Sequence, residues 1–112
     1  MRKELIAKRY RDLQLQICSE LENADGKSAF SDDRWESEIG EGHTMILQAG
    51  DAIEKAAVNF SSVAGEVTDS MRQALKIEEG QSYFAGGISS IIHPFNPFVP
   101  IIHMNVRYFE LG

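Results

Sequence analysis

The chain has 112 residues, of which 43% are hydrophobic and 25% are charged, and its formal net charge is −6. A chain of this length and composition encloses one modest core, so it is one folded domain or part of one, and general disorder is excluded. The acidic balance argues against nucleic acid or an anionic membrane surface as a partner, because both repel a negatively charged protein.

Cysteine usage and hydropathy indicate a cytoplasmic protein. The single cysteine, Cys18, cannot form an internal disulfide, so nothing indicates an oxidising compartment. No apolar run approaches the roughly 20 residues that cross a bilayer, and no signal-peptide core follows the charged N-terminus. We therefore expect a cytoplasmic location without a membrane span, and we interpret Cys18 as a packing thiol rather than a nucleophile.

The first predicted element is an α-helix from Arg2 to Asn23. Its larger apolar residues recur at spacings of three and four, which places them on one face of a helix. These residues are Ile6, Tyr10, Leu13, Ile17 and Leu21. The Asp25-Gly26 pair is expected to end the helix, because glycine readily adopts the left-handed cap. The basic residues of this helix are interpreted as a solvated face.

Weaker signals follow as far as residue 60. Residues 27–38 are expected to form an edge strand or an ordered surface segment. The run EIGEGHTMILQAG, residues 38–50, predicts a loop, a short strand and a turn, with His43 exposed in the loop. The segment Ala52–Phe60 alternates polar and apolar side chains as a strand does, although its alanines also suit a helix.

Beyond residue 60 we expect the strand to loosen at Ser61 and Ser62. Ser70 and Gln73 have capping-box spacing, which predicts a short helix that runs to about Glu79 and ends at Gly80.

The last part of the chain predicts an antiparallel hairpin. Residues 83–93 and 99–109 are rich in β-branched and aromatic side chains, and the stretch from Pro94 to Pro100, which connects them, contains all three prolines. Proline fixes φ and removes a backbone donor, so we expect a rigid connection that cannot join the interior of a sheet.

Strand parity places five polar side chains on one face of this hairpin. If His93 lies opposite Ile101, then Ser89 faces Asn105, and the set shares that face. The set is Ser89, His93, His103, Asn105 and Arg107. Such side chains suit an anionic substrate, because Arg can grip a carboxylate with two hydrogen bonds and His exchanges protons near neutral pH. A polar sheet face half covered by loops explains the same pattern and stays open as an alternative.

His93 and His103 also invite a metal interpretation, because imidazoles on neighbouring strands can share an ion. Two ligands do not make a complete site, and no nearby carboxylate or cysteine obviously completes it.

At these residues the chain resembles the oxygen-dependent coproporphyrinogen III oxidase family. The segment GISSIIHPFNPFVPIIHMNVRYFE, residues 87–110, is similar to the family's GVSxVIHPxNPxVPxxHMNVRYFE. EKAAVNFSSVAGE and DGKSAFSDDRW resemble the family's EKAGVNFSxVxGE and DGKxxFxxDxW. The chain departs from the family at Ala57, where glycine is common, at Phe95, where arginine is common, and at Glu41 and His43, which interrupt a glycine-rich run.

The resemblance implies an α+β fold with a flat antiparallel sheet flanked by helices. It implies that residues 1–112 are the N-terminal portion of a single domain, truncated after the HMNVRYFE strand. The implied activity belongs to haem biosynthesis: molecular oxygen is used to convert coproporphyrinogen III to protoporphyrinogen IX by oxidative decarboxylation. A homodimer without an organic cofactor is implied, and a divalent metal is left open.

Carried over residue by residue, the resemblance implies that His103 is the proton donor and that Ser89, Asn105, Val106 and Arg107 contact the substrate. Parity turns the Val106 side chain to the other face, so it can contribute only through its backbone. His93 and His103 match two histidines proposed as metal ligands in some bacterial members. We expect the 112-residue piece to be inactive alone. The alternative is a truncated, non-catalytic module that binds a tetrapyrrole or another protein.

Overall fold

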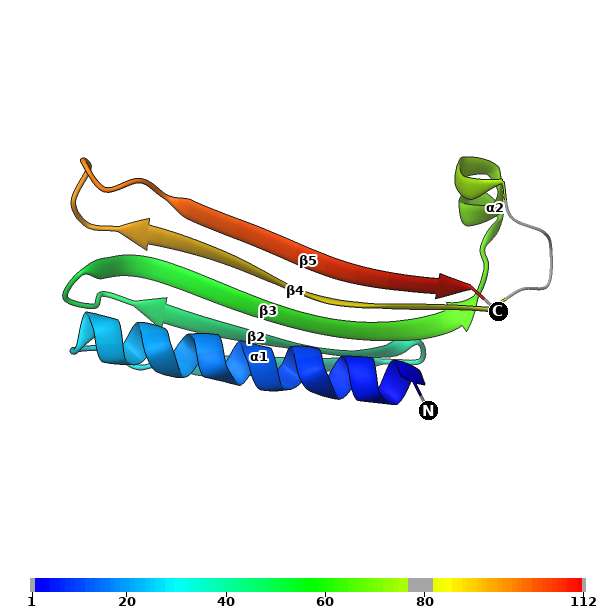
Figure 1. Cartoon of the computed structure of the whole chain (residues 1–112), viewed down its shortest axis with the longest axis horizontal. Helices are drawn as coiled ribbons and strands as arrows, with labels where there is room; N and C mark the ends of the chain where they lie inside the picture. Colours follow the sequence, from blue (N-terminus) through cyan, green and yellow to red (C-terminus); the bar gives the residue numbers. More distant parts are fainter. Residues whose placement is uncertain (1, 77–81, 112) are drawn as a thin grey trace.

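The computed structural model describes residues 2–76 and 82–111, in which a long helix lies along a five-stranded antiparallel sheet (Figure 1). The strands are hydrogen-bonded in chain order, β1-β2-β3-β4-β5. The elements are α1 (Arg2–Asp25), β1 (Ser31–Ser37), β2 (Gly40–Gln48), β3 (Ile53–Glu66), α2 (Asp69–Leu75), β4 (Ser82–Pro94) and β5 (Ile102–Leu111). A flat antiparallel sheet with two helices confirms the predicted α+β class.

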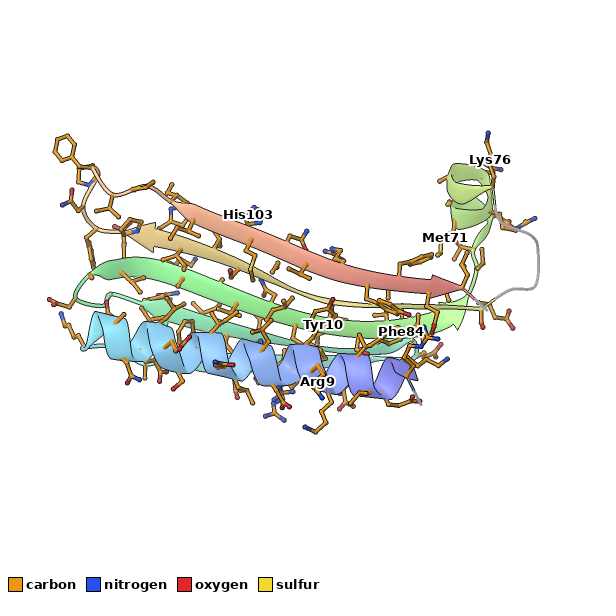
Figure 2. All side chains as sticks on the ribbon, in the orientation of Figure 1. Arg9, Tyr10, Met71, Lys76, Phe84 and His103 are labelled. Carbon is orange, nitrogen blue, oxygen red and sulfur yellow. The ribbon has the colours of Figure 1, made fainter. Side chains whose placement is uncertain are left out.

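The core lies between α1 and the central strands. Cys18 of α1 packs against Val58 of β3 and Ile88 of β4, and all three are buried. Tyr10 lies between the helix and the sheet, whereas Arg9 lies on the outer side of the helix (Figure 2). The buried position of Cys18 confirms its interpretation as a packing thiol.

The predicted apolar stripe of α1 is not buried along its whole length. Leu13 is 37% exposed, and the neighbouring Gln14 is fully buried at 0%. The Gln14 side chain donates hydrogen bonds to the carbonyl oxygens of His43 (2.6 Å) and Val58 (2.9 Å). The amide nitrogen of Gln14 thus tethers the helix to two neighbouring strands, whereas its Oε1 is buried without a hydrogen-bond partner among the described residues.

The end of α1 agrees with its prediction within two residues. The helix continues through Asp25, and Gly26 has a φ of +79° and donates its N–H to the Glu22 carbonyl at 2.9 Å. This is the left-handed cap that a glycine provides without a Cβ clash.

Among the described residues, no helix has the length and apolar character needed to cross a membrane.

The prediction of an exposed loop histidine is wrong. β2 begins at Gly40, so His43 lies inside the strand and is only 3% exposed. It pairs with Arg34 of β1 and with Phe60 of β3. Gly40 and Gly42, which precede His43, indicated a loop by their low strand propensity, but pairing on both sides keeps this segment extended, as tertiary contacts often do.

Two boundaries further along the chain also differ from prediction. β3 does not loosen at Ser61 and Ser62 but pairs with β4 as far as Glu66. The N-cap of α2 is Thr68, not Ser70, and its hydroxyl accepts the Met71 N–H at 3.2 Å. Lys76, with a φ of +56°, caps the other end of the helix; the predicted end at Glu79 and Gly80 lies outside the described residues.

Candidate functional site

The two faces of the sheet differ in what covers them. Val58 and Ile88 point toward α1, so the side chains of their strand neighbours point to the other side. We call this other side the open face. It carries the odd-numbered residues of β3, β4 and β5 that follow this alternation, including Ser89 and Asn105.

The register of the hairpin is the predicted one. Ser89 pairs with Asn105, Ile91 with His103 and Gly87 with Arg107. The side chains of His103, Asn105 and Arg107 therefore alternate along β5 on the open face, and all three are exposed. The structure brings together four of the five polar residues that parity predicted to share one face.

His93 and Val106 are placed differently from these four. The last β4–β5 pair is Ile92 with Ile102, so His93 lies one position beyond the paired region, where Lys55 of β3 is its neighbour. The side chain of His93 lies on the predicted face, at the end of the row of polar residues on the hairpin. Val106 pairs with Ile88, so its side chain lies on the α1 side, as expected.

The sequence interpretation missed a polar row that crosses the whole sheet on the open face. Each member pairs with the next across neighbouring strands. The polar row is Asp33, Thr44, Asn59, Ser89 and Asn105. Within it, the Asn59 amide nitrogen lies 3.5 Å from the Ser89 hydroxyl oxygen and donates toward it. The polar alternation around Asn59 was the available signal, but strand order was needed to connect it with Ser89.

Beside the polar row runs a second row of paired residues that contains two glycines, Gly42 and Gly87, which we call the small-residue floor. Trp35 pairs with Gly42 at one side of the sheet, and Gly87 pairs with Arg107 at the other. The indole of Trp35 lies against Gly42, and a Cβ at position 87 would come within 3.1 Å of the Arg107 Cγ. Glycine therefore lets both large side chains lie close to the sheet.

The described residues do not by themselves fit a tightly held metal ion. His93 and His103 are on neighbouring strands and on one face, but His103 pairs with Ile91 rather than with His93. Across residues 2–76 and 82–111, no group of three or more His, Cys, Asp and Glu side chains is arranged to hold an ion. Two imidazoles alone do not complete a protein metal site.

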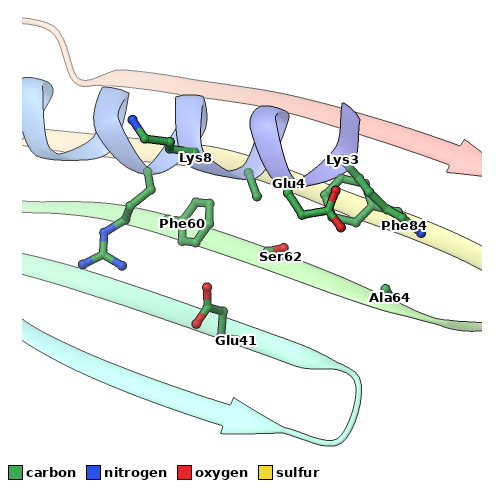
Figure 3. A pocket seen from close by; sticks show the side chains of 10 residues that line it. Lys3, Glu4, Lys8, Glu41, Phe60, Ser62, Ala64 and Phe84 are labelled. Carbon is green, nitrogen blue, oxygen red and sulfur yellow. The ribbon is translucent and has the colours of Figure 1, made fainter. Parts of the chain in front are cut away.

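A groove of about 580 Å³ lies on the other side of the sheet, between the N-terminal half of α1 and β2–β4 (Figure 3). Its floor includes Phe60 and Phe84, and its rim carries charged side chains of α1. None of the site residues predicted from the sequence lines it. The groove is therefore separate from the polar group on the open face.

Comparison with known proteins shows the family to which the chain belongs. The family model described as coproporphyrinogen III oxidase matches residues 5–112. The chain belongs to this family. Its relatives include oxygen-dependent coproporphyrinogen-III oxidases of Prochlorococcus marinus. The protein of strain MIT 9312 is 45% identical over 102 residues, which are 89% of this chain and 30% of that protein.

Other strains give similar values. The protein of strain MIT 9313 is 44% identical over 102 residues, covering 89% of this chain and 29% of that protein. For strain NATL1A the identity is 42% over 103 residues, covering 90% of this chain and 30% of that protein. The chain thus spans about 30% of the length of these curated relatives.

Proposed function

We propose that this chain is part of an oxygen-dependent coproporphyrinogen III oxidase and forms one wall of its active site. The observation that carries the proposal is the register of β4 and β5, which gathers Ser89, His103, Asn105 and Arg107 on the open face. The family membership supplies the substrate, coproporphyrinogen III, with molecular oxygen as co-substrate. A cytoplasmic homodimer without an organic cofactor belongs to the same proposal.

The reaction calls for a proton donor. Each propionate loses carbon dioxide and two electrons to become a vinyl group, and the carbon attached to the ring releases one proton. Oxygen accepts the two electrons and two protons to form hydrogen peroxide. The substrate supplies one of these protons, so a second must come from the protein or solvent. His103 has the chemistry and the exposure to supply it.

The other polar residues suit binding rather than proton transfer. Arg107 can hold a propionate carboxylate through two parallel hydrogen bonds. Ser89 and Asn105 face each other and can hydrogen-bond the same carboxylate or a pyrrole nitrogen. Val106 contributes through its backbone alone. The small-residue floor beside the polar row suits a broad, flat macrocycle.

The test uses the full-length protein that carries this sequence. Coproporphyrinogen III is added without oxygen, air is then admitted, and protoporphyrin is measured by fluorescence after oxidation. We expect product from the wild type and a fall in kcat of about 100-fold or more in His103→Ala, the range for loss of a general acid. Arg9→Ala, on the outer side of α1, is the matched control and should be fully active.

The outcomes separate the alternatives. Binding of coproporphyrin III without turnover in the wild type would favour the non-catalytic module. Unchanged turnover in His103→Ala would remove His103 from the role of proton donor, while the assignment of the reaction would stand.

A further inference from the structure

We propose that Asn59 is a positioning residue that orients the Ser89 hydroxyl toward the substrate. This inference rests on the proposed function and adds to it a residue of β3, a strand outside the hairpin. Asn59 pairs with Ser89 on one side and with Thr44 on the other, in the middle of the polar row. Its side chain lies on the open face and is half buried.

The direction of the contact decides what Ser89 can do. A hydroxyl group has one hydrogen to donate and two lone pairs to accept with. The Asn59 amide donates toward the Ser89 oxygen at 3.5 Å. With an acceptor site of Ser89 engaged from the β3 side, its own hydrogen is available to donate on the other side, where Asn105 of β5 lies. A hydroxyl oriented in this way is a donor suited to a carboxylate.

The separation of 3.5 Å is at the long end of hydrogen bonding. Hydrogen bonds in a site without its substrate are often long and tighten in the complex, so the distance is compatible with a positioning contact. If this contact shortens in the complex, Asn59 donates to Ser89 and Ser89 donates to the carboxylate. The two hydrogen bonds then strengthen each other, because each bond polarises the next.

Strand stability does not account for an asparagine at this position. Asparagine is depleted in strands, and β3 is the central strand of the sheet. Its cross-strand partners on this face are polar, so it adds no apolar packing to the core between α1 and the sheet. Residues that break a local rule in an otherwise consistent element commonly mark functional sites.

The test is a double-mutant cycle on the full-length protein. Asn59→Leu keeps the number and branching of the side-chain heavy atoms and removes the donor, and Ser89→Ala removes the hydroxyl. We expect Asn59→Leu to raise KM for coproporphyrinogen III about fivefold to tenfold with kcat within about twofold, as for loss of an indirect hydrogen bond to a charged group. In the Ser89→Ala background the same substitution should change KM less than about twofold.

Three results would overturn the inference. The first is a wild-type KM in Asn59→Leu. The second is an equal rise of KM with and without Ser89, which would indicate a packing effect. The third is absence of turnover in the wild type, which overturns the proposed function and this inference with it; the first two leave the proposed function standing. If Asn59→Leu does not fold, Asn59→Val, with a side chain favoured in strands, takes its place with the same expectations.

Discussion

The carboxylate of Asp25 lies directly against Gly50, so that a Cβ at position 50 would overlap both carboxylate oxygens. The oxygens accept five backbone N–H groups. Oδ1 accepts from Ala52 and Ile53, both at 2.9 Å, and Oδ2 accepts from Lys27, Ser28 and Asp51 at 3.2, 3.1 and 3.0 Å. One side chain thereby joins the end of α1 to the connection between β2 and β3.

Substitutions at these two positions should destabilise the protein. Asp25→Asn replaces an acceptor by an amide group whose N–H₂ confronts N–H donors, and Gly50→Ala displaces the carboxylate. Buried donors left without an acceptor are costly, so we expect each variant to lower the thermal midpoint by more than about 5 °C. Circular dichroism during heating measures this. Ala52→Ser, at an exposed position whose backbone N–H keeps its bond to Asp25, is the control; equal midpoints in all variants would contradict the prediction.

The same carboxylate predicts a dependence of stability on pH. Burial by itself would raise the pKa of Asp25, but the N–H groups of Ile53, Asp51, Ser28 and Ala52 outweigh burial and hold the pKa well below its usual value. A depressed pKa contributes stability that is complete above the unfolded pKa, about 3.9, and is lost as pH falls toward the folded pKa. The gap in thermal midpoint between wild type and Asp25→Asn should narrow progressively below about pH 4. A gap that stays constant from pH 7 to pH 2 would show that Asp25 ionisation does not contribute.

The burial of Cys18 predicts slow reaction with alkylating agents. Burial, with a smaller effect of the nearby Glu22 charge, raises the pKa of the thiol to about 11. Only the thiolate reacts, so at pH 8 the folded protein should be alkylated about 100-fold or more slowly than the unfolded protein. Peptide mass mapping of Cys18 after timed exposure to iodoacetamide, with and without denaturant, measures the ratio. Similar rates in both conditions would mean that the site opens readily.

The register of the hairpin was predictable because side chains alternate between the two faces of a strand, so few registers place the polar residues together. When His93 is placed opposite Ile101, the antiparallel register fixes the other pairs of the hairpin, including Ser89 with Asn105. The observed register contains that pair. The amphipathic stripe of α1 was predictable for the same reason. In both cases the information lies in the spacing of neighbouring residues along one element.

What could not be predicted depends on partners far away in the sequence. Gln14 is buried because two carbonyl groups of β2 and β3 face it, and Asp25 binds N–H groups that follow it by 26 to 28 residues. His43 looked like a loop residue because Gly40 and Gly42, which precede it, are weak strand formers. Asn59 became a candidate only when strand order placed it beside Ser89.

Arg107 provides the sharpest test of substrate binding on the open face. Lysine at this position keeps the positive charge but lacks the planar fork that bonds both oxygens of a carboxylate. Arg107→Lys should therefore raise KM for coproporphyrinogen III about tenfold, and Arg107→Ala should raise it further, because an interaction with a charged group is worth about 1.5–3 kcal/mol. Steady-state kinetics on the full-length protein measure both variants, with Arg9→Lys as the control for loss of an exposed guanidinium. If Arg107→Lys matches the wild type, the arginine acts through charge alone; if Arg107→Ala also matches it, the carboxylate binds elsewhere.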